Sequence, residues 1–165
     1  MVIIKNPYGI LLEKLEGFMK TFIPQKNSQA VDSIWANVGL SLSDGVLLVD
    51  RIDEGLEGEV ATRIVKWAAI SQAELRRMTG ISNTTFNRSM KTRFNADQSE
   101  RLVRFIRVMD RAVELFEGDK AEAQKWLNES NRALGWKTPA DLISSESGAY
   151  EVLKLIMRVE HGVYS

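Results

Sequence analysis

The polar residues with the most informative spacing lie in a short stretch near the middle of the chain, between Ser71 and Lys91. If the residues after Gly80 form a helix, its outer side carries asparagines, a threonine, an arginine and a lysine. In the DNA major groove, asparagine can pair with adenine, and arginine or lysine with guanine. The chemistry favoured is therefore recognition of base edges. The residues expected to take part are Gln72, Ser82, Asn83, Thr84, Asn87, Arg88 and Lys91.

Local signals around these residues predict two short helices joined by a tight turn. Ser71 can cap the first helix, and Glu74, three residues later, can complete a capping box. Gly80 stands where a residue with left-handed backbone must end that helix, and Ser82 or Asn83 can cap the second. Hairpins of this kind are found in helix-turn-helix modules that bind DNA, but ordinary helical proteins contain them too. The apolar residues that would pack across the turn are Leu75, Ile81 and Phe86.

The charge around the hairpin favours a nucleic-acid partner. Residues 63–107 contain ten basic and three acidic residues, a net charge of +7, although the whole chain is neutral. A basic region within an otherwise acidic chain is the electrostatic pattern expected for binding to phosphates. Gln72 is placed to contact a phosphate beside the positive end of the first helix. A solvated helical surface is the alternative explanation of the same charges.

A second group of polar residues lies at the C-terminal end of the chain. The pattern predicts a last helix over about 146–161 that stops at Gly162. Tyr164 in the short tail offers a flat apolar ring with one polar tip, which suits a pocket on a protein partner. From the residues alone, Arg158, Glu160 and His161 are polar residues on a helix end, for which a solvated surface is the expected environment.

The residue types needed for catalysis or metal binding are scarce. The chain has one histidine and no cysteine, which argues against a zinc site and a cysteine nucleophile. His161 beside Glu160 could suggest a general base, but neighbours on a helix point about 100° apart. The sequence also lacks a glycine-rich loop for phosphates. We therefore expect no enzyme, no catalytic residue, no metal and no cofactor.

Helices must position these residues, because apolar residues recur with helical spacing along nearly the whole chain. One such segment is closed by Pro24, and a seam of about five turns is ended by Gly118. Asp119 reads as the cap of a further helix, as does Thr138 before Pro139. The fold class expected is all-α. The apolar faces comprise Leu11, Leu15, Phe18 and Phe22; Val60, Ile64, Trp67 and Ala68; Leu102, Ile106, Met109, Val113 and Phe116; and Val152, Ile156 and Val159.

Length and composition narrow the class of protein. A chain of 165 residues, 44% of them hydrophobic, can form one domain or two small helical modules that share a core. The absence of cysteine excludes a disulfide framework and suits a reducing cytoplasm. No apolar run approaches membrane-spanning length, and Met1–Tyr8 lacks the order of a signal peptide. We expect a cytoplasmic protein without a membrane partner.

The last third of the chain carries an ordered set of residues that is far more specific than the hairpin. The set comprises Asn131, Ala133, Leu134, Gly135, Thr138, Pro139, Leu142, Glu146 and Gly148, followed by the closing run Arg158-Val159-Glu160-His161-Gly162-Val163-Tyr164. With these residues the chain closely resembles the Xre/MbcA/ParS family of antitoxins, over roughly residues 56–165. The resemblance departs at Trp136, where the family commonly has a second glycine. It also departs at Arg76, where many helix-turn-helix proteins have alanine.

The resemblance implies an organisation and a set of partners. An Xre-like helix-turn-helix domain at 41–118 would precede a toxin-binding domain at 119–165. The segment at 1–40 carries no motif that matches the family, and its apolar face makes it a candidate for dimerisation. The cognate toxin would be a RES-domain protein, which is related to ADP-ribosyltransferases and uses NAD. The C-terminal end of the antitoxin would obstruct the active-site cleft of the toxin. The residues that the resemblance implies for contact with the toxin are Arg158, Glu160, His161, Gly162, Val163, Tyr164 and Ser165. The complex would bind operator DNA and repress its own operon.

Apart from the resemblance, one short recognition helix covers few bases, so we expect a homodimer within the toxin–antitoxin complex. The apolar face of Leu11, Leu15, Phe18 and Phe22 could form that pair or cover the chain's own core.

Two other interpretations stay open from the residues. The chain could neutralise a toxin without binding operator DNA, since Arg76 puts the close packing of the two hairpin helices in doubt. It could also be a stand-alone helix-turn-helix transcription regulator with no toxin. Asn131 could end a helix or contact a partner, whereas Trp126, Leu134 and Leu142 are expected to lie in the core.

Overall fold

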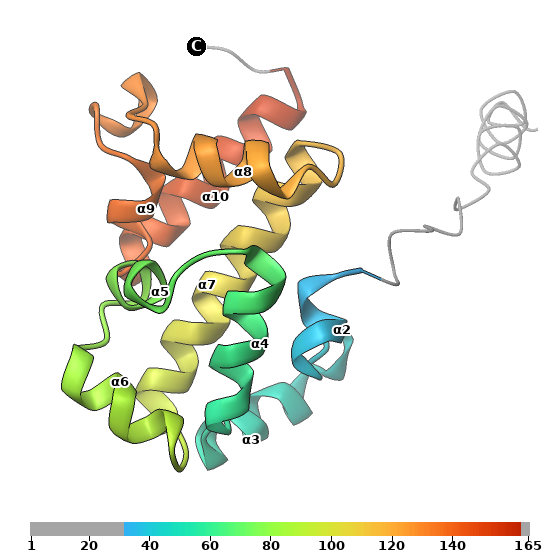
Figure 1. The fold of residues 1–165 in the computed structure, drawn as a ribbon. Coiled ribbons are helices and arrows are strands. Elements are labelled where there is room, and N and C mark those ends of the chain that lie inside the picture. Colours follow the sequence, from blue (N-terminus) through green and yellow to red (C-terminus); the bar gives the residue numbers. More distant parts are fainter. Residues whose placement is uncertain (1–31, 163–165) are drawn as a thin grey trace, which may run out of the picture. The chain divides into compact units, whose positions relative to one another are not determined.

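The computed structural model of the chain describes residues 32–162, and these form an all-α fold, as the sequence predicts (Figure 1). No β-strand occurs within this range; two isolated bridges only close loops. The α-helices are α2 (Ile34–Val38), α3 (Val46–Glu54), α4 (Gly58–Ala68), α5 (Gln72–Thr79), α6 (Asn83–Met90), α7 (Ala96–Leu115), α8 (Lys120–Asn128), α9 (Pro139–Leu142) and α10 (Glu146–Glu160). Two short 3-10 turns, η2 (Leu42–Asp44) and η3 (Arg132–Leu134), complete the elements.

Two of the sequence-based expectations fall outside these residues. The apolar face of Leu11, Leu15, Phe18 and Phe22, a candidate either for pairing two copies or for covering the chain's own core, lies before residue 32. The tail residues Val163, Tyr164 and Ser165 lie after residue 162. None of the helices in the described range is long and apolar enough to cross a membrane.

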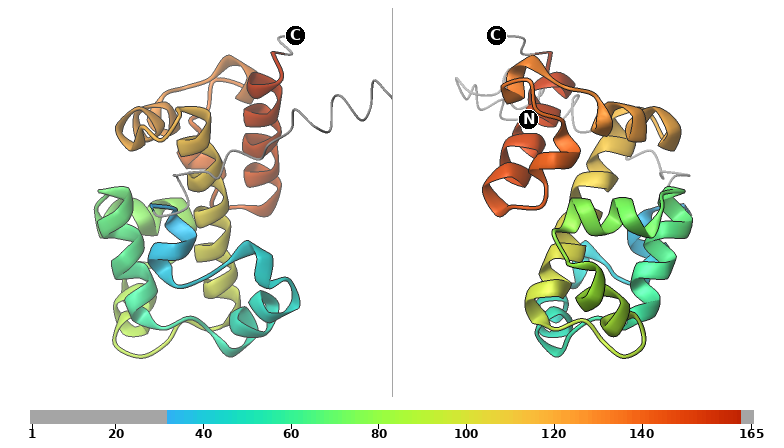
Figure 2. Two further views of the ribbon diagram at one scale, coloured as in Figure 1. Left: turned by 90° about the vertical axis from the view of Figure 1, so that its right-hand side faces the viewer. Right: turned by 60° about the vertical axis from the view of Figure 1, so that its left-hand side comes forward.

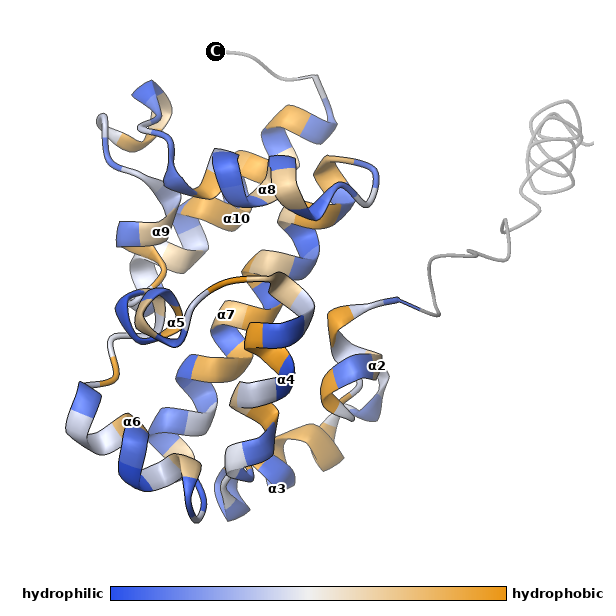
Figure 3. Cartoon of the chain, viewed as in Figure 1, coloured by the Kyte–Doolittle hydropathy of each residue, from blue (hydrophilic) through white to orange (hydrophobic). Residues whose placement is uncertain are grey.

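The core is organised around α7, the longest of these helices, against which α2, α3, α4, α5, α8 and α10 pack (Figures 1 and 2). The predicted seam is confirmed, with Leu102, Ile106 and Met109 fully buried and Val113 and Phe116 partly buried against the core. Apolar residues of α4, α7 and α10 line the inside, while α5 and α6 are largely hydrophilic on their outer sides (Figure 3). One apolar cluster therefore extends from α2 to α10, including the predicted faces of α4 and α10.

The predicted hairpin forms with the capping chemistry expected of it. Ser71 accepts a hydrogen bond from the backbone N–H of Glu74, and the Glu74 carboxylate accepts one in return from the backbone N–H of Ser71. Gly80 ends α5 at φ 68°, a left-handed conformation that costs a residue with a Cβ more than it costs glycine. Of the two candidate caps for α6, Ser82 takes the role and accepts from the N–H of Thr85. The apolar residues predicted to pack across the turn, Leu75, Ile81 and Phe86, are all buried.

The helices after α7 also begin at the predicted residues. Asp119 caps α8 and Thr138 caps α9, with Pro139 at the first helical position. Leu134 is buried, Leu142 is partly buried, and Trp126 is only half-buried, lying against Phe116 with ring centroids 6.2 Å apart. The expectation of a core tryptophan at 126 is thus met only in part, because α8 lies at the surface and leaves one side of the indole uncovered.

Side chains join the hairpin directly to the C-terminal helices. Arg77 of α5 pairs with Asp141 of α9 at 2.6 Å and donates to Asn128 at 2.8 Å. Arg104 of α7, whose side chain is only 14% exposed, pairs with Glu146 at the start of α10. Residues 32–162 belong to one compact unit, and a turn after α7 lies where the sequence suggests a boundary between modules, near residue 118.

Candidate functional sites

The outer side of α6 brings the predicted base-reading residues together. Asn83, Thr84, Asn87, Arg88 and Lys91 are all exposed, whereas Phe86 and Ser89 face inward and are buried. Helical spacing of about 100° per residue places the five exposed side chains on one continuous side of the helix. The geometry therefore fits a helix that can lie in a groove with its polar side forward.

One hydrogen bond organises this polar side, and two others engage the hydroxyl of Ser82 in capping. The side-chain amide of Asn87 donates to the amide oxygen of Asn83 at 3.1 Å, which aligns the two asparagines. Ser82, although exposed, uses its hydroxyl to cap α6 and to donate to the Thr85 hydroxyl at 2.9 Å. Gln72 is exposed in the first turn of α5, as expected for a phosphate contact.

Arg76, the unusual residue of the first hairpin helix, lies across the hairpin instead of opening it. Its guanidinium carbon is 5.8 Å from the centre of the buried Phe86 ring. A cation over an aromatic face is attracted by the ring's electron density, and the aliphatic stem of arginine adds apolar contact. The two helices therefore pack with the arginine covering Phe86, and the doubt raised by its size is answered by this contact.

The basic excess read from the sequence is largely neutralised within the described residues. Six of the ten basic residues in 63–107 pair with carboxylates, some of them from outside that window: Arg63 with Glu59, Arg77 with Asp141, Arg93 with Glu57, Arg101 with Asp97, Arg104 with Glu146 and Arg107 with Glu100. Lys66, Arg76, Arg88 and Lys91 form no ion pair with residues 32–162. Arg88 lies on α6, Lys91 directly follows it, and Arg76 packs over Phe86 of the same helix. The positive charge without a carboxylate partner is therefore concentrated at the hairpin.

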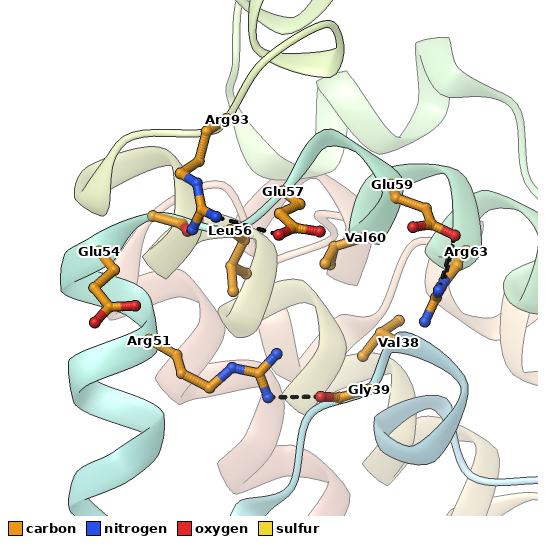
Figure 4. Close-up of a pocket in the computed structure, with 11 residues that line it drawn as sticks. Val38, Gly39, Arg51, Glu54, Leu56, Glu57, Glu59, Val60, Arg63 and Arg93 are labelled. Atoms are coloured by element: carbon orange, nitrogen blue, oxygen red, sulfur yellow. Dashed lines mark hydrogen bonds and ion pairs between the residues drawn. The ribbon is translucent and has the colours of Figure 1, made fainter.

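A charged cleft of about 370 Å³ lies beside the loop that follows α6, between α2, α3 and α4 (Figure 4). Arg93 pairs there with Glu57 at 3.2 Å, and Arg63 pairs with Glu59 at 2.8 Å. Arg51 donates to the carbonyl of Gly39 at 2.6 Å. Each of the cleft's arginines thus already has a carboxylate or carbonyl partner within the chain. We therefore assign these charges to holding α2, α3 and α4 together and not to binding a ligand.

The start of α4 approaches the end of α6 so closely that only glycine fits. A Cβ added at Gly58 would lie 2.1 Å from the carbonyl oxygen of Met90. Next to it, the N–H of Phe94 donates to the carbonyl of Leu56 at 2.8 Å. The backbone of the α3–α4 connection therefore sets the position of the C-terminal end of α6. No motif in the sequence signals this, since the glycine's partner lies 32 residues further along the chain.

At the other end of the described chain, the predicted partner-binding residues separate into different roles. Glu160 pairs with Arg111 of α7 at 2.5 Å and so ties the end of α10 to its own domain. Arg158 is half-buried, forms no ion pair within residues 32–162, and its buried Nε has no hydrogen-bond partner there. His161 is exposed and caps α10, and Gly162 follows at φ 66°.

The loop before α9 holds Asn131 in local hydrogen bonds and exposes Trp136. Asn131, left open by the sequence, accepts from the N–H of Ala133 and closes the loop by pairing with Lys137. Gly135 and Trp136 have φ angles of 66° and 65°, so the backbone suits the second glycine that the resemblance expects at 136. A tryptophan occupies this left-handed position instead, with 70% of its surface exposed.

Sequence reasoning missed two groups of exposed apolar side chains. One is on α3, where Val46, Leu47 and Val49 are 74%, 64% and 53% exposed. The other is in the C-terminal module, where Tyr150 and Met157 accompany Trp136. The seven-residue spacing of Tyr150 and Met157, out of step with the buried face of α10, is the signal that could have found the second group.

The fold and the α6 surface define a helix-turn-helix protein with a helical domain packed behind it. Comparison with known proteins agrees. Residues 47–107 match the model of the antitoxin Xre-like helix-turn-helix domain, and residues 111–162 match that of the antitoxin Xre/MbcA/ParS C-terminal toxin-binding domain. The chain belongs to this family of antitoxins.

Two curated relatives, each called antitoxin Xre, support the assignment over nearly the whole chain. The one from Photorhabdus laumondii subsp. laumondii is 39% identical over 149 residues, which cover 89% of this chain and 100% of the relative. The one from Yersinia enterocolitica serotype O:8 is 44% identical over 135 residues, covering 81% and 91% respectively. The similarity thus includes both modules.

Proposed function

We propose that this antitoxin neutralises a RES-domain, NAD-using toxin with its C-terminal end and represses its own operon by inserting α6 into operator DNA. The observation that carries the DNA part is the concentration of uncompensated positive charge at the hairpin, beside two aligned asparagines. The major groove presents the acceptors that arginine and lysine need and the donor–acceptor pair that asparagine matches.

Replacing Arg88 by alanine tests the DNA part. Loss of one base-edge contact should cost about 1–3 kcal/mol of operator binding in a gel-shift titration with the DNA upstream of the gene. Lys66→Ala, which removes an equally unpaired exposed charge from α4, is the matched control and should cost much less. Equal losses of operator affinity in both variants would mean that Arg88 contributes only its positive charge and no specific base contact. An unchanged affinity of the Arg88 variant would show that α6 is not the recognition helix, and no binding by the unaltered chain would favour a neutraliser without DNA binding.

For the toxin part, we propose that the segment 158–165 binds at the substrate cleft of the toxin, with Arg158 and Glu160 at the rim and the residues from Gly162 onward inside the cleft. Arg158 supports this role, because its partly buried guanidinium forms no ion pair within residues 32–162 and can donate hydrogen bonds to a carboxylate of a partner. The Glu160–Arg111 pair would hold the helix end in place while the tail turns at Gly162. Removing residues 162–165 should leave folding and DNA binding intact but sharply weaken inhibition of NAD consumption. If the shortened chain still inhibited the toxin fully, the proposal that the C-terminal segment fills the cleft would be contradicted.

Operator recognition by one short helix covers few bases, so we propose that the antitoxin acts as a homodimer with half-sites about 34 Å apart. The segment before residue 25 is the part proposed to pair. Deleting residues 1–24 should convert a dimer to a monomer when the mass in solution is measured by light scattering. An unchanged mass would remove this segment from the interface.

A further inference from the structure

The outer face of α10 carries apolar side chains that the fold of residues 32–162 leaves uncovered. Tyr150 is 62% exposed and Met157 is 46% exposed, whereas Val152, Leu155 and Ile156 on the inner face are buried. At about 100° per residue, Tyr150 and Met157 lie on one line along the helix, and His161 continues that line. The N–H of His161 still bonds to the carbonyl of Met157, so the helical register holds to this point.

This line forms a ridge that has a polar border. Lys154 stands between the two apolar residues, 6.0 Å from the ring of Tyr150 and paired with Glu151. Tyrosine and methionine are enriched at the centres of protein interfaces, where large apolar side chains are surrounded by polar ones. Methionine in addition adapts its shape to a partner surface at little cost.

Trp136 provides a second exposed anchor on a neighbouring element. Its loop closes through the Asn131–Lys137 pairing, and η3 within that loop packs against α10. A bulky residue at φ 65° is strained, and strained backbone of this kind gathers at functional sites. An aromatic side chain held at such a cost with 70% of its surface exposed contributes little to its own domain's core.

We infer that the toxin docks along this outer ridge of α10, defined by Tyr150, Met157 and His161, with Trp136 as a neighbouring anchor. The occupant is the toxin because the ridge lies within the toxin-binding domain, residues 111–162, and ends at the residues where the tail begins. The inference rests on the proposed function and adds that binding and inhibition depend on different parts of the domain. The ridge supplies affinity, whereas the tail beyond Gly162 supplies inhibition.

The experiment compares variants of the full-length antitoxin for binding to the RES-domain toxin encoded beside the gene, by calorimetry, and for inhibition of NAD consumption. In the double variant Tyr150→Ser with Met157→Ser, affinity should fall at least tenfold, while the thermal midpoint and operator binding stay the same. Leu47→Ser with Val49→Ser on α3 is the matched control, since it removes equally exposed apolar groups, and should keep full affinity. The chain lacking residues 162–165 should bind with nearly normal affinity yet inhibit poorly.

Trp136→Gly separates binding from folding. Glycine relieves the strain at φ 65°, so the midpoint should hold or rise while affinity for the toxin falls. Ala69→Gly, which relieves similar strain at φ 51° after α4, should leave affinity unchanged. Unchanged affinity in the double α10 variant would overturn the ridge, and a loss confined to the α3 variant would move the docking site to α3. Failure of the unaltered chain to bind this toxin would instead overturn the proposed function and the ridge with it.

Discussion

A single carboxyl group on α7 is held in an environment that disfavours its charge. Burial raises the pKa of Asp110 above its usual range, although a hydrogen bond donated by the Trp35 indole N–H at 3.0 Å opposes the shift. The indole itself is buried, so the bond joins α2 to α7 at the edge of the core. Asp110 therefore contributes to tertiary organisation as a hydrogen-bond acceptor, not as a favourable charge.

Asp110→Asn should be at least as stable as the unaltered chain at neutral pH, because an amide oxygen can still accept from Trp35 without the cost of a buried charge. A raised folded-state pKa means that the folded chain binds the proton more tightly. The penalty is thus present above that pKa and disappears as the pH falls below it. The stability difference between the two proteins should therefore shrink from pH 7.5 to pH 4, measured by urea unfolding. A variant clearly less stable at pH 7.5 would show that the negative charge is needed.

At the scale of elements, the hairpin depends on backbone contacts made by segments outside it. The α3–α4 connection bonds to the strand-like stretch after α6 through Leu56 and Phe94, and the Leu56 N–H also bonds to the buried Ser99 hydroxyl of α7. Phe94 in turn stacks edge-on against Phe86, with centroids 5.6 Å apart. Segments outside the hairpin therefore fix α6 at its C-terminal end and through the buried Phe86.

Gly58→Ala should displace this arrangement. The new methyl group would meet backbone atoms, which cannot move aside as a flexible side chain can, so the start of α4 must shift from the end of α6. We expect a loss of about 1–3 kcal/mol of unfolding free energy, typical of overpacking, together with weaker operator binding. Thermal melts and gel shifts would check both effects. Gly135→Ala meets no atom within 4 Å and carries only the backbone strain of φ 66°, so it should leave DNA binding unaffected.

At the scale of the whole described unit, the two functional modules share one interior. The apolar cluster is continuous from Ile34 of α2 to Ile156 of α10, and α7 contributes to both modules. The ion pairs Arg77–Asp141 and Arg104–Glu146 cross the same boundary. A disturbance in the toxin-binding domain should consequently reach the hairpin.

Ile156→Ala tests this shared interior. Removing a fully buried isoleucine should cost about 2–5 kcal/mol of unfolding free energy, and the unfolding transition should stay single. Amide hydrogen exchange of α6 should then speed up by a factor that reflects the same loss, although Ile156 lies in the other module. Two separate transitions, or unchanged exchange in α6, would show that the modules unfold independently.

Much of this protein could be predicted from local sequence, because the physics that starts and stops helices is short in range. Ser71 with Glu74, Gly80, Asp119 and Thr138 each act on atoms within a few residues, and all of them take the predicted roles. The exposed side of α6 follows in the same way, since helical periodicity alone separates Asn83 and Asn87 from the buried Phe86. Family membership is likewise visible in the ordered residues of the C-terminal block.

Other features were decided only by the tertiary structure, since they depend on atoms far apart in the chain. Arg104 is counted as positive charge in the sequence, but Glu146, 42 residues away, cancels it. In the sequence, nothing distinguishes Gly58 from any first residue of a helix, and only the close approach of the Met90 backbone makes glycine necessary there. Which face of α10 stays uncovered is set by what packs on the opposite face, so Tyr150 and Met157 emerge as a surface only when the helix is docked. Side-chain chemistry and capping are encoded locally, whereas charge cancellation, close approach and exposure arise from the packing of distant segments.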